Sequence, residues 1–154
     1  MNLTIGFLIC LLFGVTVLSQ ETTKIDEFEN LNCDDYLGRM DSAIAEARKN
    51  PLSRMYVLIY EGKEPRYNKT LNGPKLMSPT LGTAEAKIRS IKKWLSHREI
   101  QIERFSFVKA GFRENMTVEM WLVPAGSKPP DPTPTLKKIK YRKGKAKGFC
   151  TDCC

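Results

Sequence analysis

The sequence predicts a small α/β (α+β) domain of the βαβαβ type, in which a mixed sheet of about three to four strands packs with two helices. Two stretches, residues 34–50 and 83–97, repeat apolar residues at helical spacing. Between them, residues 55–60 form a continuous run of apolar, β-branched and aromatic side chains, which is typical of a strand covered on both faces. Because a strand follows each helix, we expect parallel strands joined by a right-handed crossover.

The N-terminal residues 1–19 carry no charged side chain, and their apolar run is too short for a comfortable membrane span. The run ends in small residues before Gln20, as signal-peptidase cleavage sites do. We therefore expect a signal peptide over residues 1–19 and an exported chain that acts in the periplasm or outside the cell. An uncleaved N-terminal anchor is the alternative. No later segment is apolar enough to cross a bilayer.

Residues 20–32 are polar and acidic, and we expect an arm that is unordered or loosely docked. A short edge strand or packing arm through Ile25 and Phe28 is the alternative. The predicted domain then covers residues 33–124. Its first helix has acidic residues in the first turn and basic residues in the last, which matches the helix dipole at both ends. The apolar stripe of that helix consists of Tyr36, Met40, Ala43, Ile44 and Ala47.

The aspartates of this helix, Asp34, Asp35 and Asp41, could in principle form a metal or acid cluster. We favour capping and a solvated helix face as the explanation, because no histidine or cysteine joins them at ligand spacing. The sequence therefore predicts no metal site and no cofactor.

Residues 61–82 are punctuated by glycine and proline and predict a loop of about twenty residues. This loop leaves the carboxyl end of the central strand, where ligands of open α/β sheets tend to bind. It is therefore the place where we expect a binding site. The candidate ligand-binding residues, from this loop and from the elements after it, are Lys63, Arg66, Lys87 and Arg113.

The second helix should begin with Thr83 as its N-cap. Its apolar stripe consists of Ala84, Ile88, Ile91 and Leu95, widened by Trp94. Two strands should follow, at 104–109 and 116–122, because apolar and polar residues alternate there. Gly111 permits the turn between them, and Pro124 ends the second strand because proline cannot donate to a ladder.

The composition predicts a proline-rich linker at 125–135, in an extended polyproline-like form, and a basic tail at 136–154. The tail holds seven lysines and arginines and one aspartate, so its net charge is +6. The net charge of the whole chain is +8, which leaves only +2 for all other residues. Such a tail can bind polyanions. For an exported protein, anionic wall polymers or surfaces are favoured over nucleic acid. A tail that only aids solubility, or an edge strand through Ile139 and Tyr141, is the alternative.

Four cysteines remain after the expected cleavage, and they allow three pairings. We expect Cys33 to pair with one of the C-terminal three, and we favour Cys150, which would fasten the tail to the domain. Cys150 and Cys153 also form a C-x-x-C, but a thioredoxin-like motif begins a helix after a strand. This one lies at the chain end. We find no catalytic signature around the single histidine, His97.

Residues 50–123 resemble the OmpA-like C-terminal domain, a periplasmic module that associates with peptidoglycan. The resemblance rests on Trp94-Leu95, Arg104-Phe105, Gly111-Phe112-Arg113-Glu114 and Thr117-Val118-Glu119-Met120. The chain resembles more closely a group of uncharacterised exported bacterial proteins, through Tyr60–Lys63, Gly111–Asn115, Val118–Trp121 and Thr133–Thr135. The first resemblance implies an OmpA-like sandwich fold in the cell envelope.

The peptidoglycan-binding pair of that family does not carry over to this chain. The family places an aspartate after the central strand and an arginine in the following helix. Here Glu61-Gly62-Lys63 follows the strand, and Lys87 stands at the helix position. Lysine cannot form the bidentate fork of arginine with a carboxylate. We therefore expect a noncatalytic exported module that binds a wall polymer or an envelope protein. A scaffold without a ligand, or an unfamiliar hydrolase or thiol-redox enzyme, is the alternative.

Overall fold

The computed structural model describes residues 21–68 and 72–150. The expected signal peptide and two of the cysteines, Cys153 and Cys154, lie outside these residues. The elements follow one another as β1 (Thr23–Phe28), α1 (Cys33–Lys49), β2 (Arg54–Asn68), β3 (Gly73–Met77), α2 (Thr83–His97), a 3₁₀ turn η2 (Ile102–Arg104), β4 (Phe105–Asn115) and β5 (Thr117–Val123).

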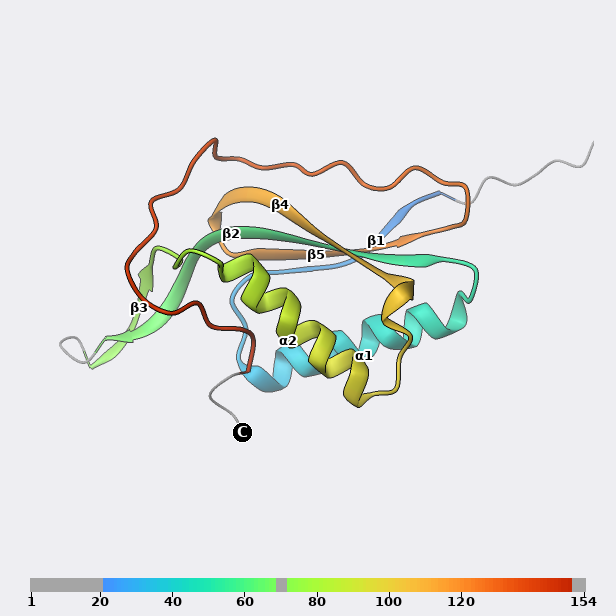
Figure 1. Ribbon diagram of the computed structural model, residues 1–154, viewed down its shortest axis with the longest axis horizontal. Helices are drawn as coiled ribbons and strands as arrows, with labels where there is room; N and C mark the ends of the chain where they lie inside the picture. Colours follow the sequence, from blue (N-terminus) through green and yellow to red (C-terminus); the bar gives the residue numbers. More distant parts are fainter. Residues whose placement is uncertain (1–20, 69–71, 151–154) are drawn as a thin grey trace, which may run out of the picture.

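The five strands form one mixed sheet that confirms the predicted α+β class. Strand β2 pairs with β5 on one side and with β4 on the other, and β1 lies beyond β5. The β2–β4 pair is parallel, as the crossover through α2 predicted, and the other pairs are antiparallel. Both helices lie on the same side of the sheet, which we call the helix face (Figure 1).

The core lies between the helices and the sheet, where the sequence placed it. All five predicted stripe residues of α1 are buried. In β2, residues 55–60 are 0–1% exposed apart from the half-buried Tyr56. In α2 the stripe is rotated slightly, because Ile88 is only partly buried whereas Ala86 and Lys87 are buried. A smaller cluster of Leu58, Tyr60 and Ala110 lies on the opposite face of the sheet, which we call the outer face.

Two segments that the sequence assigned to irregular structure are strands. The loop predicted at 61–82 is largely a hairpin, because β2 continues to Asn68 and pairs antiparallel with β3. This hairpin is polar and mostly exposed, so its sequence lacks the apolar alternation that identifies a half-buried strand. Within residues 20–32, β1 pairs with β5, and the edge-strand alternative is therefore the one that the structure has.

The turn predicted at Gly111 is instead a bulge inside β4. Lys109 pairs with Ile59 and Gly111 with Tyr60, so one extra residue of β4 is accommodated opposite β2. Gly111 has φ +98°, a value that glycine adopts without strain. The chain reverses at Met116, between β4 and β5. The predicted N-cap is also displaced by one residue, to Gly82, and the Thr83 hydroxyl donates to the Thr80 carbonyl at 2.7 Å.

After β5, residues 125–150 form an extended segment without a long strand or helix, which we call the strap. The strap crosses the outer face, passes around the end of the sheet near β3 and reaches the start of α1 on the helix face (Figure 1). Isolated bridges join Leu136 to Phe112 and Arg142 to Thr80. The predicted linker and tail are thus one docked segment, and the predicted Cys33–Cys150 disulfide at its end is confirmed.

Among the described residues, no helix has the length and apolar composition that crossing a membrane requires.

Candidate functional site

Three buried glutamates lie beneath the strap, and each takes part in holding it. Glu61, Glu64 and Glu119 are 7%, 4% and 2% exposed. A buried carboxylate is costly unless it is paired and hydrogen-bonded. Glu61 accepts directly from Tyr141 of the strap, whereas Glu119 and Glu64 pair with Arg113 and Lys87, which contact Thr133 and Phe149 of the strap. The strap and the three carboxylates therefore form one structural unit, which is the candidate functional site.

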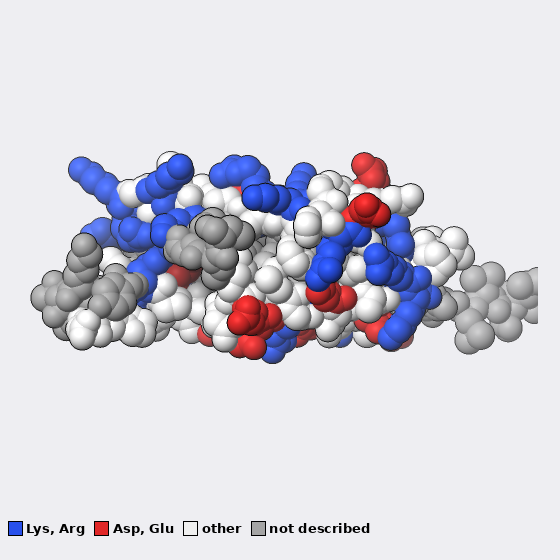
Figure 2. All heavy atoms as spheres, turned by 90° about the horizontal axis from the view of Figure 1, so that it is seen from below, with Lys and Arg blue, Asp and Glu red and all other residues white. Residues whose placement is uncertain are grey.

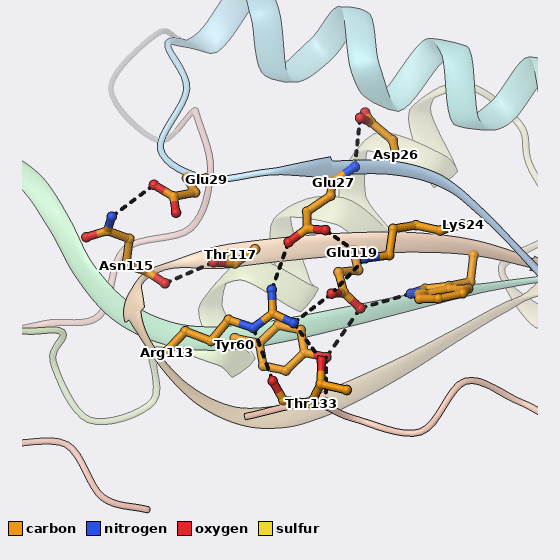
Figure 3. Close-up of polar contacts among 11 residues, drawn as sticks. Lys24, Asp26, Glu27, Glu29, Tyr60, Arg113, Asn115, Thr117, Glu119 and Thr133 are labelled. Atoms are coloured by element: carbon orange, nitrogen blue, oxygen red, sulfur yellow. Dashed lines mark hydrogen bonds and ion pairs between the residues drawn. The ribbon is translucent and has the colours of Figure 1, made fainter. Parts of the chain in front are cut away.

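The first carboxylate, Glu119 on β5, lies on the outer face. Its Oε1 accepts from Arg113 Nη2 at 2.7 Å and from Lys24 Nζ at 3.2 Å. Its Oε2 accepts from Trp121 Nε1 at 3.0 Å and from Tyr60 Oη at 3.3 Å. Arg113 also contacts Glu27 at 2.9 Å and reaches Thr133 of the strap, as Figure 3 shows. Burial raises the pKa of Glu119, but the donors outweigh burial, so the pKa lies below its usual value.

The second carboxylate, Glu61, joins β2 to α2 and to the strap. Its Oε1 accepts from the Ala84 backbone N–H at 2.8 Å, which caps the helix in place of the predicted threonine. Its Oε2 accepts from the Tyr141 hydroxyl at 2.5 Å. Burial and this hydrogen bond raise the pKa of Tyr141 to about 12. A hollow of about 350 Å³ beside this contact is lined by Leu81, Gly82 and Lys109 among others.

The third carboxylate, Glu64, brings together two of the predicted candidates. Glu64 pairs with Arg66 at 2.6 Å and with Lys87 at 2.9 Å. Lys87 is 7% exposed, and its ammonium lies 4.3 Å from the ring centroid of Phe149 in the strap. Burial lowers the pKa of Lys87, against the opposing effect of Glu64. Two of the sequence-predicted residues are thus joined at one carboxylate, although they lie on a hairpin and a helix.

The end of the strap is anchored by an aromatic contact beside the disulfide. Phe149 stacks on Tyr36 of α1 with ring centroids 4.2 Å apart, and its backbone N–H donates to Ser90 Oγ at 2.9 Å. Gly148 lies so close to α2 that a β-carbon there would be 2.9 Å from Ser90. Cys150 then bonds to Cys33 at the start of α1. The strap therefore closes against both helices.

The other two predicted candidates lie apart from this Glu64 cluster. Lys63 is exposed and contacts Glu114 at 3.4 Å, so it takes no part in the buried contacts. Arg113 lies on the outer face with Glu119. Sequence reasoning missed the three glutamates themselves. The available signal was a carboxylate inside an otherwise apolar strand, which is strongest for Glu119 between Val118 and Met120.

The strap presents its positive charge to solvent. Arg142 is half-buried, and its backbone N–H donates to the Pro79 carbonyl at 2.9 Å. Six exposed lysines lie between residues 136 and 150, namely Lys137, Lys138, Lys140, Lys143, Lys145 and Lys147, and Lys128 near the start of the strap is exposed and paired with Asp131. Figure 2, which looks at the helix face, shows Lys and Arg side chains at the end of the molecule that carries the β2–β3 hairpin and also toward the opposite end. The basic residues therefore form a surface in a fixed position.

Within residues 21–68 and 72–150, no group of three or more His, Cys, Asp or Glu side chains is placed to hold a metal ion. His97 is exposed at the end of α2, near the Trp94 ring.

The contacts of Glu119 predict an acid-sensitive contribution to stability. The pKa of Glu119 is lower in the folded protein than in the unfolded chain. Its contribution to the free energy of unfolding is therefore present at pH values above the unfolded-state pKa, and it is lost as the pH falls through the folded-state pKa. Glu119→Gln should lower the free energy of unfolding by about 3 kcal/mol at pH 7. The deficit should shrink below about pH 4. Urea titrations between pH 7 and pH 3 measure both effects, with the exposed Glu103→Gln as control. A deficit that does not change with pH would contradict this assignment.

Comparison of the chain with protein-family models, with curated proteins and with solved structures finds no match.

Proposed function

We propose that this protein is a noncatalytic exported module of the cell envelope that binds an anionic wall polymer through the lysines of its strap. One observation carries the proposal: a segment with six exposed lysines between residues 137 and 147 is held in place by Glu61, by Arg113 and Lys87, which pair with buried glutamates, and by a disulfide. A tail that only aided solubility would need none of these contacts. A cationic segment held in an extended form loses less conformational entropy when it binds a polyanion.

The proposal of export rests on the expected signal peptide and on the disulfide, because disulfides persist in oxidising compartments. The OmpA-like resemblance supports an envelope location, and it remains part of the proposal. The ligand chemistry differs from that of the resembled family, because Lys87 is buried against Glu64 and Phe149. Lys87 is therefore not presented to a ligand, and the lysines of the strap take the binding role.

Neutralising three strap lysines should weaken binding far more than neutralising three lysines elsewhere. The test variant is Lys140→Gln/Lys143→Gln/Lys145→Gln, and the control is Lys49→Gln/Lys92→Gln/Lys93→Gln, which removes the same charge from α1 and α2. Each lysine near an anionic surface contributes about 1 kcal/mol, so the strap variant should bind roughly a hundredfold more weakly. Co-sedimentation with purified cell wall, at low and high salt, measures the difference.

Equal losses in the two variants would mean that net charge alone, and not the strap, is responsible. Binding that persists in high salt and in both variants would point to a site elsewhere on the domain. No binding to cell wall by the wild-type protein would favour the scaffold alternative.

A further inference from the structure

The outer face holds a short proline-flanked stretch of the strap by contacts to its backbone. Residues 132–134 read Pro-Thr-Pro, so Thr133 has the only backbone N–H between Asp131 and Thr135. That N–H donates to the Tyr60 hydroxyl at 3.1 Å. The sheet thus offers one acceptor at the one position where the stretch has a donor.

Arg113 recognises the same residue from the other side. Its Nη2 donates to Thr133 Oγ1 at 2.8 Å, and its Nε donates to the Thr133 carbonyl at 3.4 Å. The guanidinium lies 3.7 Å from the Tyr60 ring centroid, and the ion pair with Glu119 holds it there. Figure 3 shows Tyr60 and Arg113 both directed at Thr133. A guanidinium stacked and paired in this way is fixed in position before the stretch arrives.

The next proline lies where the sheet lacks a side chain. A β-carbon at Gly111 would lie 3.0 Å from Cβ of Pro134, so the bulge in β4 leaves room for the ring. Thr135 and Leu136 then donate their N–H groups to the Phe112 carbonyl at 3.0 and 3.1 Å. Thr133, Pro134 and Thr135 are nevertheless exposed. The stretch therefore lies on the surface in a shallow, specific site and is not part of the core.

We propose that Tyr60, Gly111 and Arg113 form a binding site for extended Pro-X-Pro peptides, which the strap occupies in this chain and which takes the same motif from a partner protein. The stacked aromatic and guanidinium groups suit an extended, preorganised proline-containing backbone. The strap competes from within the same chain at an effective concentration on the order of mM. A partner segment therefore binds when the strap is displaced or when several motifs bind together.

The test uses the full-length protein with its own stretch disabled. Thr133→Pro removes the N–H and the hydroxyl and leaves the charge and the disulfide unchanged. The probe is a fluorescein-labelled peptide of residues 129–136, followed by anisotropy in about 1 M salt, where the Debye length is about 3 Å. We expect saturable binding by T133P, at least about tenfold tighter than by the wild type. If T133P does not fold, Thr133→Val, which removes only the hydroxyl, replaces it.

Two controls determine whether the binding uses this site. Adding Tyr60→Phe to T133P removes the acceptor and keeps the ring, and it should weaken peptide binding at least about tenfold. A peptide with proline at the threonine position should bind equally weakly. Failure of a folded T133P protein to bind, or equal binding of the two peptides, would overturn the proposal. Sedimentation could also show that the wild-type protein is a dimer and that T133P is a monomer. That result would overturn the proposal, because the site would then bind the strap of a second copy of this chain and not a partner protein.

Discussion

Removal of the Cys33–Cys150 disulfide should lower the free energy of unfolding by about 4–5 kcal/mol, because the bond closes a very long loop. The two cysteines are 117 residues apart in the sequence, with Cα atoms 5.2 Å apart. In the chain-entropy description, such a cross-link removes many conformations from the unfolded ensemble. The double variant Cys33→Ser/Cys150→Ser, compared with the oxidised wild type in urea titrations, measures the loss.

The variant should also release the end of the strap. Phe149 would remain stacked on Tyr36 only through its own packing and the Ser90 hydrogen bond. Limited proteolysis after the strap lysines should therefore become faster. The matched control is Cys153→Ser/Cys154→Ser, which should leave both stability and proteolysis unchanged. Peptide mapping that pairs Cys33 with either of those two cysteines would contradict the structure directly.

Gly62→Ala should destabilise the protein by about 3 kcal/mol or more, because there is no room for a β-carbon. Such a carbon would lie 2.1 Å from the Asn115 carbonyl carbon and 2.4 Å from the Met116 nitrogen. These are backbone atoms at the end of β4, and the Met116 N–H donates to the Lys63 carbonyl at 3.1 Å. The strands would have to separate there, and backbone atoms cannot avoid the contact by changing a rotamer.

The same substitution elsewhere supplies the control. Gly38 lies on the exposed side of α1, and a β-carbon there meets nothing within 4 Å. Gly38→Ala should therefore raise the free energy of unfolding by about 0.5–1 kcal/mol, since alanine favours the helix. Thermal and urea unfolding of the two variants should shift in opposite directions. A Gly62→Ala protein as stable as the wild type would mean that β2 and β4 do not approach each other as described.

The exposed lysines and the proline-flanked stretch both belong to the strap, but the two binding proposals that rest on them can be tested separately. Binding to an anionic polymer depends on the exposed lysines and weakens as salt rises. Binding of a Pro-X-Pro peptide depends on Tyr60, Gly111 and Arg113 and is measured where salt has suppressed charge effects. Failure of either experiment leaves the other result intact.

The elements that could be predicted from the sequence are those with a local signal. The apolar stripe of α1, the apolar run of β2 and the alternation of β5 each depend on residues a few positions apart. The disulfide could be predicted because Cys33 directly precedes the first helix and Cys150 follows the basic tail. The hairpin of β2 and β3 was missed because an exposed hairpin needs no apolar pattern. The bulge at Gly111 was taken for a turn because glycine permits both structures.

By itself, the sequence determined the two amphipathic helices, the central strand and the concentration of positive charge near the C-terminus. These follow from periodicity and composition, which act over short distances along the chain. The tertiary structure alone decided that the basic segment is a docked strap. A carboxylate such as Glu61 becomes a fastening point only when a donor 80 residues away, Tyr141, is folded against it. Whether a polar side chain is buried, and whether it finds a hydrogen-bond partner there, depends on its neighbours in space, which cannot be identified from the order of residues along the chain.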